Sequence, residues 1–300
     1  MVALFLLAGC QLVFPLHDRP DAAAGDGDAM TAGDGGGGRD SVGSPAVACE
    51  VTEAPRFDVG LTFGHNFVPD VDGNRAVKEL NGVIRYTEVS PNLSTEGGYT
   101  TLFDTLPANM VGVDAPALAS TGDRMILRAR LDTGVDALVE SVRTGENTWS
   151  PPQLIELRDI NDTVIGFASG QEPTQATDTQ PRHMLVDTDG AFTEYVEIQP
   201  LVWRQLATTT AGSLGIPELR NASLTENGLR LVYLGQPAGG QLQRVYTYKR
   251  STIDEPFTGA PTELYQNQVE TESYPYLSND CKLLWYVSAA NQIREVGFQL

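Results

Sequence analysis

The sequence predicts an all-β fold made of repeated units of four short strands, and three features support that prediction. A degenerate phrase of apolar residues, a polar turn and further apolar residues recurs, most clearly at 117–127, 222–233 and 276–286. Apolar and polar residues alternate on both sides of Gly239 and Gly240, as expected of a hairpin. No long stretch repeats its apolar positions every 3.6 residues, so helix is expected to be scarce.

The phrase returns with a period of about 53 residues. Leu224 and Leu277 occupy equivalent positions 53 residues apart, and Leu118 precedes Leu224 by 106 residues, twice that spacing. The doubled gap predicts a further copy near residue 171, and a weak copy is present at 176–186. An aromatic residue follows the reference position by 31 to 33 residues in three units, as Trp149, Trp203 and Phe257.

Units of about 50 residues with four short strands each are typical of β-propeller blades. One more step back along the chain reaches 65–73, so about five units fill residues 48–300. The last unit stops at Leu300 one strand short, whereas a propeller has to close. We therefore predict a β-propeller of about five four-stranded blades, closed by an N-terminal strand within Cys49–Leu61 that completes the last blade. Such closure removes an exposed sheet edge.

The repeated phrase also resembles the TolB-type, WD-like propeller repeats of bacterial envelope proteins. Ser120–Asp123 and Ser278–Asp280 carry the likeness best, through the pattern apolar-Ser-x-Asp-Gly followed by apolar residues. Cys281 stands where the pattern has glycine. The resemblance extends from about residue 50 to residue 300, and it implies a propeller in the cell envelope.

The first ten residues resemble a lipoprotein signal peptide. Val2–Gly9 is apolar but too short to cross a bilayer, which needs about 20 apolar residues. Leu7–Cys10 resembles the lipobox of bacterial lipoproteins, which implies cleavage before Cys10 and lipid attachment to its sulfur. No Lys or Arg precedes the apolar run, so either the true start lies upstream or the segment is not a working signal. Gln11, by analogy with lipoprotein sorting, favours the outer membrane, at its periplasmic or surface face.

Residues 11–47 are predicted to be a disordered tether. Asp18–Pro45 is rich in Asp, Ala and Gly and lacks apolar periodicity, so it cannot offset its ordering entropy. The run Gly35–Gly38 is not followed by Lys and Ser or Thr, which excludes a phosphate-binding loop. The propeller domain is then expected at 48–300.

Two cysteines remain in the predicted propeller, Cys49 and Cys281. They lie in the two segments that closure would bring together, and disulfides persist in exported proteins. Sequence cannot show the separation of the sulfurs, so a Cys49–Cys281 disulfide and a pair of unpaired thiols both stay open.

Composition narrows the classes of function. The chain has 39 acidic residues against 20 basic ones and a net charge of −19, which repels phosphate backbones and argues against a nucleic-acid partner. The histidines His17, His65 and His183 lack the spacing of a zinc site, and Asp70–Asn74 is better explained as a turn than as a calcium loop. There is no nucleophile-elbow motif. We therefore expect no metal and no cofactor, and we assign no catalytic residue.

Five-bladed propellers include glycoside hydrolases, which carry acidic residues on the innermost strands, around a central funnel. In such enzymes one carboxyl group donates a proton and another attacks or activates water. The candidate carboxylates at inner-strand ends are Asp58, Asp123, Glu226 and Asp280. All but Asp58 fall in the turn of the repeat, where Asp or Asn caps backbone amides, so a structural role is favoured for them.

The resulting hypothesis is a membrane-tethered envelope propeller, anchored through Cys10, that acts as a non-enzymatic protein- or ligand-binding module with an envelope protein or a glycan as partner. One alternative is a carbohydrate-active enzyme that uses a carboxylate pair in the funnel. Another is a purely structural envelope protein. Two or three converging carboxylates would favour the enzyme.

Overall fold

A computed structural model of the chain describes the strands and many of their connections. The described residues are 57–59, 68–69, 75–80, 83–88, 100–119, 122–145, 148–168, 171–176, 180–188, 190–215, 219–225, 227–235, 244–257, 260–265, 275–277, 283–287 and 293–297. All of them belong to one compact unit, Ser44–Leu300. Among them, no helix has the length and apolar character that a membrane span requires.

The described strands form five sheets, numbered here in chain order. Sheet 1 contains β2 (Val68–Pro69), β3 (Arg75–Leu80), β4 (Val83–Glu88) and β5 (Thr100–Thr101). Sheet 2 contains β6 (Met110–Leu118), β7 (Arg124–Leu131), β8 (Asp136–Gly145) and β10 (Gln153–Leu154), and β9 (Thr148–Trp149) also pairs with β8. Sheet 3 contains β13 (Glu172–Ala176), β14 (His183–Thr188), β15 (Ala191–Gln199), β16 (Val202–Thr210), β11 (Glu156–Arg158) and β12 (Val164–Ile165). Sheet 4 contains β17 (Arg220–Leu224), β18 (Arg230–Gly235), β19 (Arg244–Lys249) and β20 (Thr262–Tyr265). Sheet 5 contains β21 (Tyr276–Leu277), β22 (Leu283–Val287), β23 (Ile293–Gly297) and β1 (Phe57–Val59).

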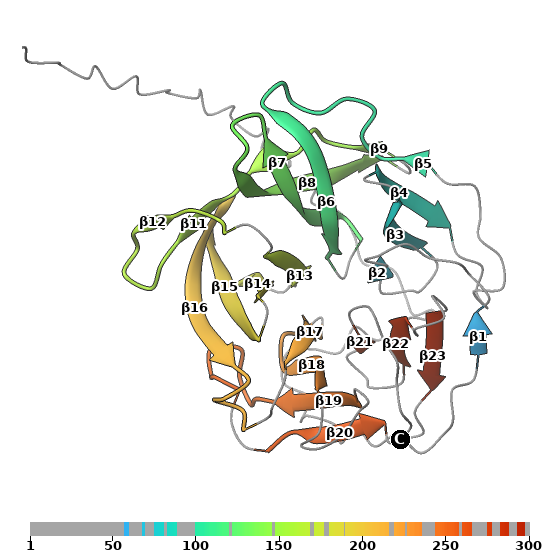
Figure 1. Ribbon diagram of the computed structural model, residues 1–300, viewed down its shortest axis with the longest axis vertical. Helices are drawn as coiled ribbons and strands as arrows, with labels where there is room; N and C mark the ends of the chain where they lie inside the picture. Colours follow the sequence, from blue (N-terminus) through green and yellow to red (C-terminus); the bar gives the residue numbers. More distant parts are fainter. Residues whose placement is uncertain are drawn as a thin grey trace, which may run out of the picture. The chain divides into compact units, whose positions relative to one another are not determined.

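The sheets follow one another around a common centre, as the predicted β-propeller requires (Figure 1). In each sheet the first strand of the repeat, β2, β6, β13, β17 or β21, lies nearest the centre, and the next two strands follow outward in sequence order. Sheet 5 takes its last strand from the other end of the chain, because β1 pairs antiparallel with β23, Phe57 opposite Glu295 and Val59 opposite Ile293. The predicted all-β propeller, closed by the N-terminal strand, is confirmed.

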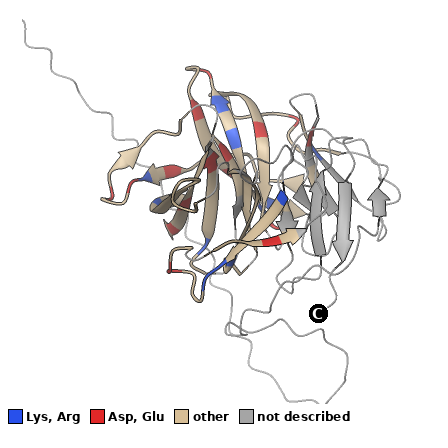
Figure 2. Cartoon of the chain, turned by 60° about the horizontal axis from the view of Figure 1, so that its bottom comes forward, with Lys and Arg blue, Asp and Glu red and all other residues tan. Residues whose placement is uncertain are grey.

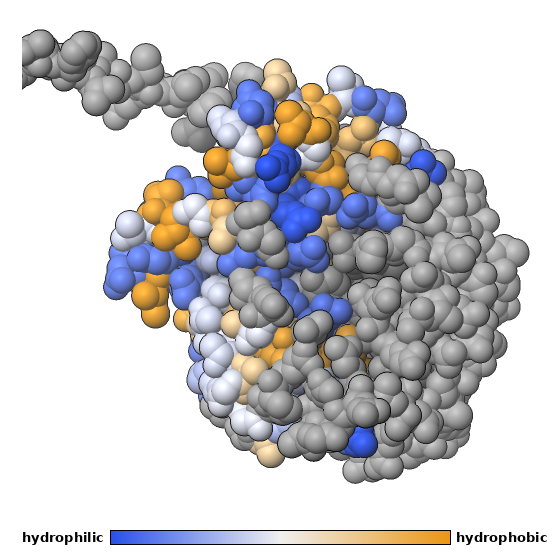
Figure 3. All heavy atoms as spheres, viewed as in Figure 1, coloured by the Kyte–Doolittle hydropathy of each residue, from blue (hydrophilic) through white to orange (hydrophobic). Residues whose placement is uncertain are grey.

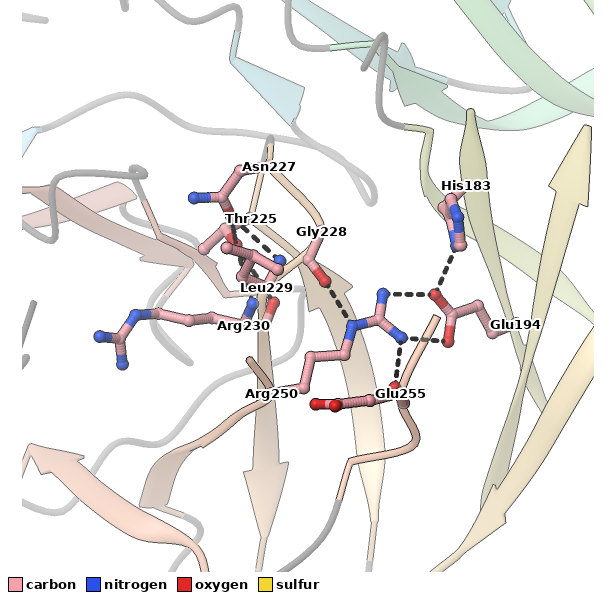
Figure 4. Close-up of polar contacts among 9 residues, drawn as sticks. All are labelled: His183, Glu194, Thr225, Asn227, Gly228, Leu229, Arg230, Arg250 and Glu255. Carbon is pink, nitrogen blue, oxygen red and sulfur yellow. Dashed lines mark hydrogen bonds and ion pairs between the residues drawn. The ribbon is translucent and has the colours of Figure 1, made fainter. Parts of the chain in front are cut away.

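The repeated phrase encodes one turn between the first and second strands. Gly122 and Gly228 both have a positive φ, of 70° and 68°, a region that favours glycine. Their amides donate to the carbonyl groups of Ala119 and Thr225, each at 2.8 Å. In sheet 4, Asn227 Oδ1 also accepts from Thr225 Oγ1 at 2.8 Å, which fixes the same turn by a side chain (Figure 4). The polar residues of the phrase therefore serve backbone geometry.

The core lies between consecutive sheets. β14 sends Met184 and Val186 to a cluster shared with sheet 2, and sends Leu185 to a cluster shared with sheet 4. This follows from the alternation of side chains along a strand. The recurring aromatic residues also lie here, since Trp203 and Phe257 are buried. Tyr233 is buried too and stacks on Tyr246 and Tyr248, with ring centroids at 5.6 and 5.9 Å.

One element departs from the four-strand pattern. The β11–β12 hairpin precedes β13 in the chain but joins the outer edge of sheet 3, where β11 runs parallel to β16. Asp159 Oδ1 closes its turn by accepting from the amides of Asn161 and Thr163, each at 2.8 Å. Ile160 and Val164 are 67% and 61% exposed, and orange atoms mark this part at the left edge of Figure 3. The sequence analysis did not predict this hairpin.

Candidate functional site

Three innermost strands, β6, β13 and β17, share an irregularity in their pairing register, and the candidate site lies next to it. Asp114 of β6 lies opposite Arg128 of β7, Glu172 of β13 opposite Asp187 of β14, and Arg220 of β17 opposite Leu234 of β18. The register shifts directly after this pair in β6 and β17, and one residue later in β13, where Pro173 is still paired with Val186. Each pair thus lies just before the irregularity of its strand. The three pairs are therefore equivalent positions of the repeat.

In two of the three strands, the backbone amide of the residue after the pair binds the preceding sheet. Ala115 and Asn221 follow Asp114 and Arg220, and both have a positive φ, of 46° and 51°. The amide of Ala115 donates to Glu79 Oε2 of sheet 1 at 3.4 Å, and the amide of Asn221 donates to Asp187 Oδ2 of sheet 3 at 2.8 Å. Glu79 and Asp187 lie on the second strands of their sheets. At these two junctions a carboxylate is bound to the backbone of the next sheet.

The junction between sheets 2 and 3 is built differently. Pro173 follows Glu172, and proline has no amide hydrogen to donate. Arg128 occupies the second-strand position and reaches across instead, with Nη1 at 3.4 Å from both Glu172 Oε1 and the Gln171 carbonyl oxygen. Within its own sheet the same guanidinium binds Asp114 with two bonds, Nε to Oδ1 at 2.6 Å and Nη2 to Oδ2 at 2.8 Å. Bidentate pairing of this kind fixes orientation as well as charge.

We call Glu79, Asp114, Arg128 and Glu172 the inner-strand cluster. The side chains of Asp114, Arg128 and Glu172 are 35%, 20% and 30% exposed, so the group borders solvent while held by two sheets. Basic and acidic residues lie on adjacent strands of the described sheets (Figure 2). The cluster brings two carboxyl groups, those of Asp114 and Glu172, onto one guanidinium, and a third, that of Glu79, accepts from the adjacent Ala115 amide.

The pKa values of Arg128 and Glu79 are both raised in the cluster, for different physical reasons. Hydrogen bonds to Asp114 raise the pKa of Arg128 above its ordinary value, and the nearby charges of Asp114 and Glu172 act in the same direction. Burial raises the pKa of Glu79, and the charges of Asp114 and Glu172 raise it further, against the opposing effects of the Ala115 amide and Arg128. Glu79 therefore takes up a proton more readily than an ordinary glutamate.

A second layer of charges is buried between sheets. Glu140 of β8 and Glu194 of β15 lie opposite Ile126 and Leu185, two residues before Arg128 and Asp187, so these glutamates are also equivalent. Arg182, just before β14, approaches Glu140 with Nη2 at 2.5 Å.

Arg250, just after β19, repeats this contact at the next junction. It donates to both oxygens of Glu194, from Nη2 at 2.6 Å and Nη1 at 2.9 Å, and His183 Nδ1 lies 2.7 Å from Glu194 Oε1 (Figure 4). Burial alone would raise the pKa of Glu194, but the hydrogen bonds and charges of His183 and Arg250 hold it below its ordinary value. This buried layer joins sheets and is shielded from solvent.

The recurring aromatic residues complete the buried layer. Arg182 lies over the ring of Trp203, 5.1 Å from its centroid, and Arg250 lies over Phe257 at 4.4 Å. A desolvated guanidinium is attracted to an aromatic face. In two of the three units, the aromatic residue at the recurring spacing therefore supports an inter-sheet arginine.

The carboxylates proposed from the sequence lie elsewhere. Asp58 is on β1, at the opposite edge of its sheet from the innermost strand β21, so the expectation that it lies at an inner-strand end is wrong. Its strand is the one supplied to close the ring, which is why it lies outermost. Asp123 is in the exposed turn after β6. Glu226, Asp280, Cys10, Cys49 and Cys281 lie outside the described residues.

The inner-strand cluster was not predicted from the sequence. Asp114 stands four residues before the reference Leu118, as Arg220 does before Leu224, so a search at that offset could have found charged residues. No metal-binding group of three or more His, Cys, Asp or Glu side chains occurs in the part of the chain that the structure describes.

Known proteins resemble the chain in structure only. No protein-family model matches the sequence, and a search of curated proteins finds no match either. Among solved structures, TolB from Acinetobacter baumannii is 13% identical, with 78% of this chain aligned and a TM-score of 0.41; this chain spans about half, 54%, of the TolB chain. A gluconolactonase, XC5397 from Xanthomonas campestris, is 9% identical over 78% of this chain and 71% of its own, with a TM-score of 0.46. An oligogalacturonate lyase from Vibrio parahaemolyticus is 10% identical over 77% and 76%, with a TM-score of 0.40.

These similarities correct one expectation from the sequence. The chain was expected not to be an enzyme, yet the solved structures that resemble it include a lyase and a gluconolactonase. A propeller fold with degenerate repeats is therefore no ground for excluding catalysis, and the expectation is withdrawn. At these identities the likeness concerns the fold alone.

Proposed function

We propose that this chain is a lipid-tethered propeller of the cell envelope that binds a basic segment of an envelope protein at the inner-strand cluster. The observation that carries the binding site is the Asp114–Arg128–Glu172 network, which joins the innermost strands of two sheets through Arg128 on a second strand. The lipobox-like Leu7–Cys10 and the Gly- and Asp-rich stretch after it support the tethered part of the proposal.

Exposure separates this cluster from the buried ion pairs. Glu140, Glu194 and their arginines are almost wholly buried, so a partner could reach them only by parting the sheets. Asp114 and Glu172 keep about a third of their side-chain surface exposed, and carboxylate oxygens can accept hydrogen bonds from a partner. These two carboxylates are the contact groups in the proposal.

Charge favours a basic partner. The cluster holds three carboxyl groups and one guanidinium, and the whole chain carries −19. A field of one sign steers ligands of the opposite sign and raises their association rate. A lysine or arginine of the partner would bind between Asp114 and Glu172 beside Arg128, and the complex should weaken as salt rises.

The binding site is tested by capture from detergent-solubilised envelopes of cells that make the protein. The full chain, the variant D114N/E172Q and the control D123N/E255Q serve as baits. The control makes the same two chemical changes at exposed residues. A partner captured by the wild type and the control, lost at high salt and lost with D114N/E172Q, is the expected result. Equal capture by all three baits would remove the cluster from the proposal.

The tether is tested at Cys10. The variant C10S should move the protein from the membrane fraction to the soluble fraction and abolish labelling by an alkyne-bearing fatty acid. The variants C49S and C281S should leave both readouts unchanged, because neither cysteine follows the lipobox pattern. Membrane retention of C10S would rule out the lipid anchor.

A second candidate function is hydrolysis of a glycan at the same cluster. It is favoured by the raised pKa of Glu79 beside Asp114, because glycoside hydrolysis needs a carboxyl group that keeps its proton near one that does not. A panel of aryl-glycosides provides the assay. Hydrolysis by the wild type and by D58N, together with its loss in E79Q and in D114N, would support this function. Absence of turnover on the whole panel would leave the binding role as the better account.

A further inference from the structure

The three described junctions at the inner strands form two types. At two of them a carboxylate on the second strand accepts a hydrogen bond from a backbone amide of the next sheet, as Glu79 does from Ala115 and Asp187 does from Asn221. At the third, Arg128 replaces the carboxylate and Pro173 replaces the donor. The side chain on one sheet and the backbone on the next thus change together.

Each type follows from the chemistry of its two positions. A carboxylate opposite Pro173 would find no amide hydrogen, and proline cannot take the positive φ seen at Ala115 and Asn221. An arginine there has no amide to bind either, but it can donate to the Gln171 carbonyl oxygen and to Glu172. An arginine in place of Glu79 or Asp187 would leave the facing amide without its acceptor.

We infer that the residues at positions 128 and 173 together decide which of the two junction types forms, and we call this pair of positions the two-position switch. Arg128 is then the positioning residue that keeps Asp114 and Glu172 together and partly exposed. This inference rests on the proposed function for its purpose, because it explains why one junction carries contact groups while two are closed by the backbone. The chemistry of the switch itself does not depend on any partner.

A double-mutant cycle tests the switch. All four proteins carry D114N, so that no unpaired aspartate faces the new carboxylate, and R128E and P173N are introduced singly and together. Asparagine is chosen because Asn221 holds the equivalent place and the residue tolerates a positive φ. We expect P173N to raise the midpoint of thermal unfolding in the R128E background and to lower it when Arg128 is present. The same shift in both backgrounds would overturn the inference.

A milder test uses Glu79 as a reporter, so that the result does not depend on the cycle variants folding. The charge of Arg128 lowers the pKa of Glu79, against burial and the charges of Asp114 and Glu172, which raise it. Carbon-13 NMR of the Glu79 carboxyl group, assigned with E79Q, should show a still higher pKa in R128Q and a value near the wild type in R128K. An unchanged pKa of Glu79 in R128Q would show that the charge of Arg128 does not act on the cluster, and that result would contradict the positioning role.

The two proposals fail separately. Coupling in the cycle combined with undiminished capture by D114N/E172Q would keep the switch and reject the proposed partner site. Absence of coupling combined with loss of capture would reject the switch and keep the partner site.

Discussion

At the scale of single residues, the charged side chains of this chain fall into two groups that differ in burial and in role. Glu194 is almost fully buried, yet its pKa is held below the ordinary value, although burial would raise it, because His183 and Arg250 both bind it. Glu79 is half-buried with weaker partners, and its pKa is raised. A buried carboxylate that is bound by cationic partners stabilises the junction. A carboxylate with weaker partners takes up a proton more readily.

Replacing Glu194 should show how much free energy of unfolding is lost when its buried partners have no counter-charge. E194Q leaves the guanidinium of Arg250 buried without a counter-charge, and removing one partner of a buried pair typically costs ~3–5 kcal/mol. Urea unfolding of E194Q against wild type measures the loss. E255Q, which changes an exposed glutamate, is the matched control and should shift the free energy of unfolding little.

The same pair predicts a pH dependence with a definite sign. The folded pKa of Glu194 lies below its unfolded value, so its stabilising contribution is full above the unfolded pKa, about 4.3, and is lost as pH falls through the folded value. The difference in unfolding free energy between wild type and E194Q should therefore be constant near neutrality and shrink below about pH 4. A difference that grows on acidification would contradict the lowered pKa.

At the scale of elements, the repeated phrase mainly specifies the turn between the first and second strands of a unit. Gly228 lies at a positive φ, and a Cβ at that position would come within 2.9 Å of Ile253 Cδ1. We expect G228A to lower stability by about 1–2 kcal/mol, because an L-residue is strained in this region. The control is G112A on β6, where an added Cβ meets nothing within 4 Å. Thermal unfolding of both variants decides the comparison, and equal midpoints would dismiss the role of the turn.

At the scale of the whole propeller, sequence predicted what depends on period and missed what depends on register. The spacing of Leu118, Leu224 and Leu277 was enough to predict sheets arranged around a centre and a ring closed by the N-terminal strand. This is because each unit must bury the same faces. The Arg128–Glu172 contact was not predictable, since it needs the irregularity after Asp114 and the sheet that follows. The β11–β12 hairpin escaped because its parallel pairing with β16 joins segments that no local pattern relates.

Closure also makes the most global prediction. β1 covers the edge of β23, and an uncovered strand edge presents free backbone groups that pair with other chains. Removing residues 1–59 should therefore lower the thermal midpoint and promote self-association, both readable by calorimetry and light scattering. Removing residues 1–43, which precede the compact unit Ser44–Leu300, is the control and should leave the propeller monodisperse with its midpoint unchanged. If the longer truncation behaves like the control, the ring does not depend on its N-terminal strand, because sheet 5 would then be stable with three strands and an open edge.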